Sequence, residues 1–394
     1  MKKTVVIILI IIIIAIGAIA IPLYISSRNS YKTEDDGKDV VLADSIKDSY
    51  EGDIIYSRFG LQKGIYCISM ENGKKHCIAK GKLENAVLSK GVLAFIELDL
   101  KSGEKNLKCT SLNDESTINI YNCKADQIEK AAINPEGTLV VYKKRVEDEN
   151  KKIEYDLYSV SIDSMQETPL GIDARSVVDV SFIGSSSIIY TKLITKDENS
   201  TYQVFTYSFT DKKEKRIHTS DSNDIDPVAS PDGKYIAYLS IVGTRYSPCI
   251  MTADGENFGE DSGEDDGEDG AINKDVVLGG TLRWSPNSRY LLYTSVSYSS
   301  PDVYTVKVVD TASHCQSKAI GSGYIGGFSP DSRAVVFASY VQDGNSKQQT
   351  ISISDIEEKN SWEIISMTEA YGCYAKSINM LEWVNNIKKS KKIE

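Results

Sequence analysis

One stretch of this chain decides the fold: Ser230-Pro231-Asp232-Gly233, followed by the apolar run Tyr235-Ile236-Ala237-Tyr238-Leu239. Pro-Asp-Gly is a turn signal, and the run after it has the aromatic and β-branched character of a strand. The same order returns at Ser285-Pro286-Asn287-Ser288 and at Ser329-Pro330-Asp331-Ser332, each followed by another apolar run. Weaker copies begin at Ser89, Asn134 and Gly184.

The clear copies begin 55 and 44 residues apart, and only strand-like segments lie between them. A repeat of this length made of short strands is typical of the blades of a β-propeller. The first blade lacks an inner strand before Ile54, whereas the run from Ile378 to Trp383 has no blade of its own. We therefore predict an all-β, seven-bladed β-propeller whose last strand completes the first blade, with six or eight blades as the alternatives.

These features resemble the TolB-type, WD-repeat-like (PD-repeat) β-propeller family, whose repeat joins a Trp-Ser-Pro-Asp-Gly turn to an Ile-Ala-Tyr-like strand. Trp284-Ser285-Pro286 and Ser230-Pro231-Asp232-Gly233 are the best matches, and the resemblance covers residues from about 50 to 385. The family includes the propellers of prolyl oligopeptidase and dipeptidyl peptidase-like enzymes, but this sequence shows neither their hydrolase domain nor the domain that precedes the propeller in TolB. The resemblance implies an exported binding platform.

The first 25 residues predict a membrane-targeting element. Lys2 and Lys3 precede an almost unbroken apolar run from Val5 to Ile25, which as a helix would span roughly 30 Å. This pattern predicts an uncleaved single-pass anchor with a cytoplasmic N-terminus and an extracytoplasmic body. The alternative is a cleaved signal peptide, for which Ala18-Ile19-Ala20 offers a site.

The rest of the chain divides by composition. Residues 26–50 are polar and predict a flexible tether, 51–387 form the propeller, and 388–394 are a solvated basic tail. The net charge of −11 argues against nucleic acid as a partner, because phosphates require a basic surface.

Catalytic motifs are missing from the sequence. There is no Gly-x-Ser-x-Gly elbow of a serine hydrolase, and the three histidines, His76, His218 and His314, fall near outer strands of different blades. A metal-dependent propeller enzyme needs ligands that converge on the channel. We therefore expect no catalytic residues and no cofactor.

Cysteine pairing is open. Cys67 and Cys77 flank the hairpin signal Asn72-Gly73 almost symmetrically, so a disulfide between them is a candidate in an exported protein. The alternative for all seven cysteines is a buried free thiol that behaves as a small apolar residue.

An acidic run lies within blade five, before the segment Lys274–Leu278 that we expect to be the outer strand of that blade. Carboxylates among glycines can ligate Ca²⁺, although the order fits no EF-hand loop, and a self-repelling surface loop is the preferred interpretation. The candidate calcium ligands are Glu260, Asp261, Glu264, Asp265, Asp266, Glu268 and Asp269.

The mouth of the central channel is the remaining candidate site. Asp224 and Asp226 belong to the inner strand of blade five, and Asp179 belongs to that of blade four. Arg283 and Glu382 take equivalent positions in blades six and one. Charges on inner strands converge on the channel, where they could bind a ligand or partner, or satisfy one another through water.

The sequence thus predicts a membrane-anchored, extracytoplasmic propeller that acts as a non-catalytic binding scaffold. The expected partner is an envelope or cell-surface protein, or a cell-wall component. Two alternatives are a propeller enzyme that acts on a glycan, by lyase-like or hydrolase-like chemistry, and a sensor that reports ligand binding through the membrane helix.

Overall fold

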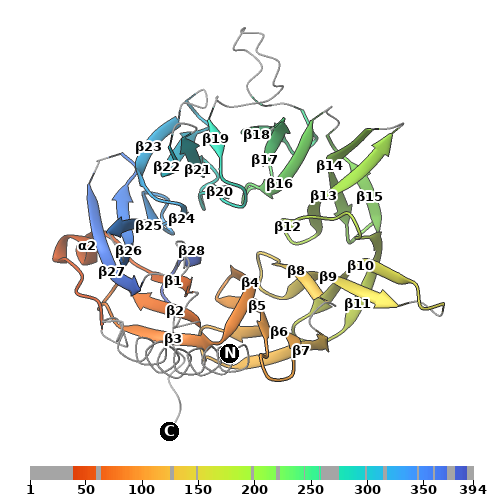
Figure 1. Cartoon of the computed structure of the whole chain (residues 1–394), viewed down its shortest axis with the longest axis horizontal. Coiled ribbons are helices and arrows are strands. Elements are labelled where there is room, and N and C mark those ends of the chain that lie inside the picture. The colour runs from red at the N-terminus through yellow and green to blue at the C-terminus, as the bar shows by residue number, and fades with distance from the viewer. Residues whose placement is uncertain are drawn as a thin grey trace, which may run out of the picture.

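The computed structural model forms a ring of seven β-sheets (Figure 1). It describes residues 39–387 apart from gaps at 59–63, 125–127, 148–149, 197–198, 219–221, 244, 257, 259–274, 298–299, 314–316, 344–345, 358–359 and 371–377. The prediction of an all-β, seven-bladed propeller is therefore confirmed. No helix in these ranges is long and apolar enough to cross a bilayer, and residues 1–25, the predicted anchor, lie outside them.

The blades follow one another along the chain. Blade one is β28 (Ile378–Val384), β1 (Asp53–Arg58), β2 (Gly64–Ser69) and β3 (Lys75–Lys80); blade two is β4 (Lys82–Ser89), β5 (Val92–Leu98), β6 (Glu104–Ser111) and β7 (Thr117–Lys124). Blade three is β8 (Ile128–Ile133), β9 (Leu139–Glu147), β10 (Ile153–Ser161) and β11 (Glu167–Asp173); blade four is β12 (Val180–Ile183), β13 (Ser187–Lys196), β14 (Asn199–Ser208) and β15 (Lys213–Arg216).

The second half of the ring is less regular. Blade five is β16 (Asn223–Ala229), β17 (Tyr235–Val242) and β18 (Arg245–Thr252); blade seven is β24 (Ile325–Phe328), β25 (Ala334–Asp343), β26 (Ser346–Asp355) and β27 (Ser361–Ala370). Blade six is β21 (Tyr290–Ser297), β22 (Ser300–Asp310) and β23 (Ser317–Ser322), with the short strands β19 (Val276–Val277) and β20 (Arg283–Trp284) both paired to β21.

The prediction for the outer strand of blade five was wrong. Val276 and Val277 pair with β21, so this part of the predicted strand contributes to the inner edge of blade six. Burial is the physical reason, because Val277 packs with Leu282 in the cluster between blades five and six. The outer strand β15, by contrast, is exposed along its whole length. An apolar run of this kind does not suit an exposed outer edge.

A buried aromatic residue on the second strand of each blade explains much of the core. These side chains are Tyr56, Phe95, Tyr142, Tyr190, Tyr238, Tyr293 and Phe337, and each packs into the interface with the preceding blade. A separate apolar cluster fills every one of the seven interfaces. The ring is therefore continuous, as a propeller requires if no blade is to expose an apolar face.

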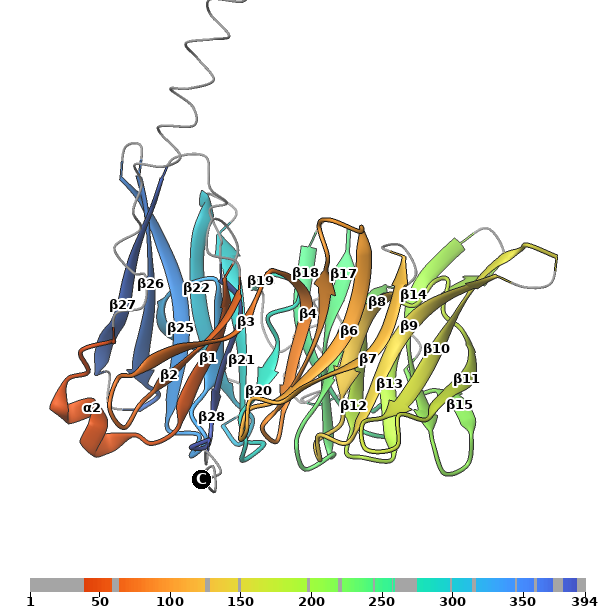
Figure 2. The same ribbon diagram turned by 90° about the horizontal axis from the view of Figure 1, so that it is seen from below.

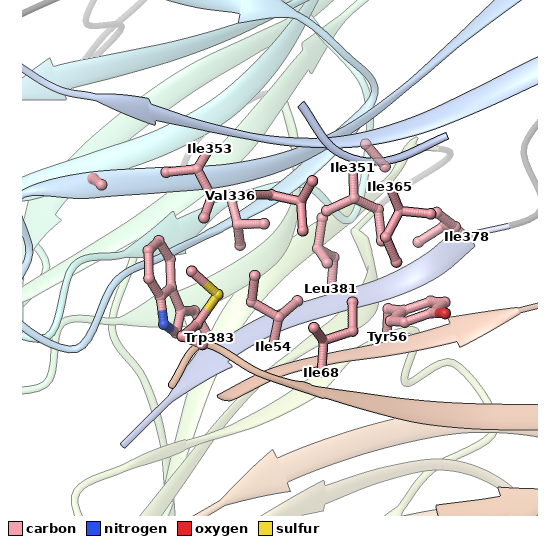
Figure 3. Close-up of a cluster of buried hydrophobic side chains, with 14 of the residues drawn as sticks. Ile54, Tyr56, Ile68, Val336, Ile351, Ile353, Ile365, Ile378, Leu381 and Trp383 are labelled. Atoms are coloured by element: carbon pink, nitrogen blue, oxygen red, sulfur yellow. The ribbon is translucent and has the colours of Figure 1, made fainter. Parts of the chain in front are cut away.

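The ring closes where the two ends of the propeller meet, as the sequence predicts. β28 pairs antiparallel with β1, with Trp383 opposite Ile54 and Glu382 opposite Ile55. Figure 3 shows Leu381 and Trp383 of β28 in the same cluster as Val336 and Ile353 of blade seven. The closing strand thus joins blade one through backbone pairing and blade seven through side-chain packing.

Part of the predicted tether instead packs on the ring. Residues 39–50, which we call the strap, contain the helix α2 (Asp44–Ser49) and lie beside blades seven and one (Figure 2). Leu42, Ile46 and Tyr50 of the strap are buried in the same cluster as Leu381 and Trp383 of the closing strand. The prediction of a flexible tether is therefore wrong for residues 39–50. The segment is polar on average, but these three apolar side chains bury enough surface to hold it on the ring.

The candidate disulfide between Cys67 and Cys77 is not formed. Cys67 lies opposite His76, whereas Cys77 lies opposite Tyr66. Because neighbouring residues of a strand point to opposite faces, this offset of one residue directs the two thiols to different faces of the sheet. Cys67 is buried between blades one and two, as the alternative of a buried thiol expects, whereas Cys77 is only half-buried.

The repeated turns link neighbouring blades. In each clear copy the serine hydroxyl accepts the backbone N–H at the start of the second strand, as Ser285 Oγ does from Tyr290 N at 2.8 Å. The fourth turn residue is left-handed, with φ of 60° at Ser288 and 63° at Ser332. Their hydroxyls accept backbone N–H groups of the preceding blade, from Asp232 to Ser288 at 2.9 Å and from Asn287 to Ser332 at 3.1 Å.

Substituting Ser332 tests these links. Ser332→Ala keeps the left-handed strain and removes the acceptor for Asn287 N, so we expect a loss of about 1 kcal/mol in the free energy of unfolding. Ser332→Gly loses the same hydrogen bond but relieves about 1 kcal/mol of strain, so we expect almost no change. Urea denaturation of both variants measures this difference, and equal losses would contradict the account.

Candidate functional site

The inner strands bring one set of charged residues to the channel. Lys130 on β8, Asp179 at the start of β12 and Asp226 on β16 occupy equivalent positions in blades three, four and five. Their equivalence follows from strand pairing. Two positions after each of them, the inner strand pairs with the residue that directly precedes the buried aromatic of the second strand. The innermost strands β8, β12 and β16 follow one another along one side of the centre of the ring in Figure 1. Successive blades therefore place these side chains side by side.

Contacts join these residues into a row. Lys130 Nζ lies 3.1 Å from Asp179 Oδ1, and the backbone N–H of Gly280 donates to Asp226 Oδ2 at 2.5 Å. The carboxyl groups of Asp179 and Asp226 are close enough to share a hydrogen bond when one of them is protonated. Asp179 Oδ2 is buried and has no hydrogen-bond partner among the described residues, and a protonated Asp226 would supply one.

The pKa of Asp226 reflects this arrangement. Burial raises it most, the negative charge of Asp179 and the hydrogen bond between the carboxyls raise it further, and Gly280 N–H and Lys130 oppose the shift. The net effect raises the pKa of Asp226 to about 7. Near neutral pH the pair therefore exchanges one proton between solvent and the channel mouth.

A pocket of about 150 Å³ opens beside the pair. Polar and apolar residues share the lining, which consists of Asp179, Val180, Ser181, Asp226, Pro227, Val228, Gly280, Leu282 and Arg283. Three of the five residues predicted at the channel mouth thus line one pocket. We call Lys130, Asp179, Asp226, Gly280 and Arg283 the channel-mouth site.

Glu382 borders this site through an ion pair. Arg283 Nε of blade six lies 3.4 Å from Glu382 Oε1 of blade one, although blade seven stands between these blades. Gly327 of blade seven allows this approach, because a Cβ there would lie 2.9 Å from Leu381 O and 3.6 Å from Glu382 Oε2. Burial raises the pKa of Glu382, and the charge of Arg283 opposes the shift.

Asp224 is not part of the channel mouth, contrary to our prediction. It is fully buried and lies 3.7 Å from His218 Nε2, whose ring also contacts Tyr238 Oη at 3.3 Å. The bulge at Asp226 shifts the register of β16, so the two aspartates, although two residues apart, do not share an environment. Asp224 therefore belongs to a buried polar group between blades four and five.

The predicted calcium ligands cannot be placed in the structure. Glu260, Asp261, Glu264, Asp265, Asp266, Glu268 and Asp269 lie outside the described residues, as does His314. Within the described part of the chain no three His, Cys, Asp or Glu side chains gather as metal ligands. His76 lies 3.7 Å from Glu115 between blades one and two, remote in sequence and blade from His218.

Sequence reasoning missed Lys130 and Gly280. Lys130 lies in a blade whose turn is only a degraded copy of the repeat, so its register was not evident. An alignment of the strands that follow the turns would have placed it with Asp179 and Asp226. Gly280 contributes a backbone N–H, for which side-chain chemistry gives no signal.

The raised pKa of Asp226 makes a pH-dependent prediction. Between about pH 4 and pH 7 the folded chain holds a proton that the unfolded chain has released, so this group makes stability fall as pH rises. Asp226→Asn removes the effect and can still accept from Gly280 N–H. We expect urea denaturation to show the variant gaining stability relative to wild type from about pH 5 to about pH 8.

Asp331→Asn is the matched control for that experiment. Burial opposes the shift, but hydrogen bonds from Ser329 and Arg333 dominate and lower the pKa of Asp331. Its contribution is therefore lost only in acid, below the ordinary aspartate range. The stability of this variant relative to wild type should stay constant over the same pH range. An equally constant difference for Asp226→Asn would contradict the shared proton.

Comparison with known proteins supports the fold and no single activity. No protein-family model and no curated protein match the chain. Its structure is similar to TolB from Acinetobacter baumannii, with 13% identity, coverage of 85% of this chain and 67% of TolB, and a TM-score of 0.48. An oligogalacturonate lyase from Vibrio parahaemolyticus has 12% identity, coverage of 80% and 91%, and a TM-score of 0.54.

Prolyl endopeptidases are also similar, with 10% identity and a TM-score of 0.59 over 84% of this chain and 50% of theirs. At these identities the similarity defines the fold alone. The chain is a seven-bladed β-propeller, and the comparisons support the expected resemblance only at the level of this fold. Since the neighbours include a lyase and peptidases as well as TolB, the function must be argued from the site.

Proposed function

We propose that the chain is a non-catalytic binding propeller, anchored by its N-terminal segment with the ring on the extracytoplasmic side. Its channel-mouth site binds a cationic group, a lysine or arginine side chain, presented by an envelope or cell-surface protein. The observation that carries the proposal is the convergence of Asp179, Asp226 and Arg283 from three blades on one pocket.

The chemistry of the pocket favours binding by charge. A cation that displaces the shared proton would restore both carboxylates of Asp179 and Asp226 to the ionised form. Arg283 is held by Glu382 and by the carbonyl oxygen of Leu282 at 2.8 Å, so it limits where a cation can enter. Binding should therefore tighten as pH rises through about 7.

The lining offers no activated nucleophile among the residues that the structure describes there. Ser181 is the hydroxyl-bearing side chain of the pocket, and its Oγ donates to the carbonyl oxygen of Pro227 at 3.1 Å. A serine nucleophile would instead need to donate to a base. This contact favours a binding site over acyl transfer.

An acid-catalysed reaction on a glycan is the second candidate. Asp226 has a raised pKa near the operating pH, which is typical of general acids. Turnover of an acidic oligosaccharide that is lost in Asp226→Asn would favour this enzyme over the scaffold.

Affinity purification tests the proposal. The full chain is purified from solubilised native membranes as wild type, Asp226→Asn and Asp179→Asn, with and without Ca²⁺. We expect a protein that binds wild type but not the two pocket variants, independently of Ca²⁺. The matched control is Lys234→Gln, because Lys234 is largely exposed on the turn of blade five and its substitution should retain the partner. Equal recovery with all four chains would contradict the proposal.

A further inference from the structure

The channel-mouth site contains a positive charge that the proposed function leaves without a ligand. Asp179 and Asp226 are proposed to bind the cationic group of the partner, but Arg283 lines the same pocket. The Arg283 side chain is 33% exposed, so its guanidinium is accessible to a ligand there. The pocket therefore offers a carboxyl pair and a guanidinium to the same occupant.

The guanidinium of Arg283 is held at two of its three nitrogens. Nη1 donates to the carbonyl oxygen of Leu282 at 2.8 Å and to that of Gly280 at 3.3 Å. Nε lies 3.4 Å from Glu382 Oε1, so this ion pair is looser than a charge-assisted hydrogen bond of about 2.8 Å. The described part of the chain places no hydrogen-bond acceptor on Nη2, so its two N–H groups can donate to a ligand.

Gly280 joins the anionic and cationic sides of the pocket. Its N–H donates to Asp226 Oδ2 at 2.5 Å, and its carbonyl oxygen accepts from Arg283 Nη1 at 3.3 Å. Its φ of 73° is left-handed, which favours glycine, and a Cβ at Gly279 would lie 3.2 Å from Asp226 Oδ2. The N–H and the carbonyl oxygen of one residue are no more than about 4 Å apart, so Asp226 Oδ2 and Arg283 Nη1 lie within about 10 Å of each other.

Ion pairs already balance most of the charge around the pocket. Lys130 Nζ lies 3.1 Å from Asp179 Oδ1, and Arg283 is paired with Glu382. A ligand with a positive charge alone would bring a third cation close to Lys130 and Arg283, and the repulsion would weaken its binding. A carboxylate on the same ligand would offset this repulsion by pairing with Arg283. The charges therefore favour a ligand that carries both signs.

We propose that the basic residue bound at the channel mouth is the C-terminal residue of the partner protein. This binding mode rests on the proposed function, because the side-chain cation of a terminal lysine or arginine still binds Asp179 and Asp226. The α-carboxylate of the same residue accepts hydrogen bonds from Arg283 Nη2. In lysine a flexible four-carbon stem separates the two charges, so one residue can bridge groups that lie within about 10 Å. An internal lysine would bring an uncharged peptide group to Arg283 instead.

Isothermal titration calorimetry on the full chain in detergent at about pH 8 tests this binding mode. The two ligands are acetylated Ala-Ala-Lys peptides, one with a free C-terminal carboxylate and one with a carboxamide. We expect wild type to bind the carboxylate form at least about tenfold more tightly, because only this form makes a charge-assisted hydrogen bond with Arg283. Arg283→Gln should reduce this ratio to below about threefold. Glu382→Gln should increase it, because the internal carboxylate no longer competes for Arg283.

Three further variants are the controls. Asp226→Asn should weaken binding of both peptides, because wild-type Asp226 is mostly ionised at about pH 8. Lys234→Gln, on the exposed turn of blade five, should bind both peptides as wild type does. Each variant is first compared with wild type by circular dichroism, and Arg283→Met replaces Arg283→Gln if the latter is unfolded.

The outcomes distinguish the C-terminal binding mode from the proposed function. Equal binding of the two peptides by wild type, with both weakened in Asp226→Asn, would overturn the C-terminal mode and leave the cation site in place. Tighter binding of an amidated peptide in which an aspartate follows an internal lysine would also overturn it. Absence of binding by both peptides would overturn it as well, and recovery of a partner by affinity purification would then decide the proposed function separately.

Discussion

Removal of residues 378–394 is expected to prevent the ring from closing and to leave an unstable, self-associating chain. β28 pairs with β1 from Asp53 to Arg58, so its loss exposes a free edge on blade one. It also removes Ile378, Met380, Leu381 and Trp383, all buried. At roughly 1.5–3 kcal/mol for each side chain, this loss is comparable to the whole stability of a typical domain.

Size-exclusion chromatography and thermal unfolding measure this outcome. The control is truncation after Ile387, which removes only the basic segment 388–394 and keeps the bond from Ile387 N to Asp53 Oδ2 at 2.7 Å. This shorter truncation should behave as wild type. A monomeric chain with unchanged unfolding after removal of residues 378–394 would contradict closure by β28.

Trp383→Ala is expected to cost about 3–5 kcal/mol, because a large aromatic side chain leaves a cavity at the closure. The Trp383 ring lies 5.4 Å from the ring of Tyr50 in the strap, and Nε1 donates to Glu51 O at 3.0 Å. We expect the variant also to release the strap, which limited proteolysis would detect as faster cleavage within residues 39–50.

Trp284 supplies the matched control. It occupies the equivalent position in blade six and donates from Nε1 to Val228 O at 3.0 Å, but it is only half-buried and lies away from the closure. Trp284→Ala should therefore cost clearly less and leave the strap protected. Trp383→Phe should cost less than Trp383→Ala, because it removes the hydrogen bond and only part of the buried ring. Equal losses for the two alanine variants would show that the closure has no special role in stability.

The fold could be predicted from the sequence because its signals are local. The Ser-Pro-Asp-Gly turn fixes where one strand ends, and Tyr238 and its counterparts mark the strand that fills each interface. The closing strand could be predicted because the strand-like run Ile378–Trp383 belonged to no other blade. Both signals remain readable although the repeat is only weakly preserved in blades two to four.

The errors arose where long-range packing overrides local pattern. A one-residue offset across the β2–β3 hairpin separates Cys67 from Cys77, and a bulge at Asp226 separates it from Asp224. Similarly, Val277 pairs with a strand of the next blade, and the burial of Ile46 holds a mainly polar segment on the ring as the strap. For the site, Asp179, Asp226 and Arg283 were found from their charge, whereas Lys130 required the blade-to-blade register.

Site-specific photo-crosslinking tests the central claim, that a partner docks at the channel mouth, most directly. A photoreactive amino acid is placed at Ser181, in the pocket wall, or at Lys234, on the exposed turn of blade five. The account predicts one crosslinked protein in native membranes at position 181, lost on adding Asp226→Asn, and none at position 234. The same crosslinks at both positions, or crosslinking at 181 that persists with Asp226→Asn, would contradict it.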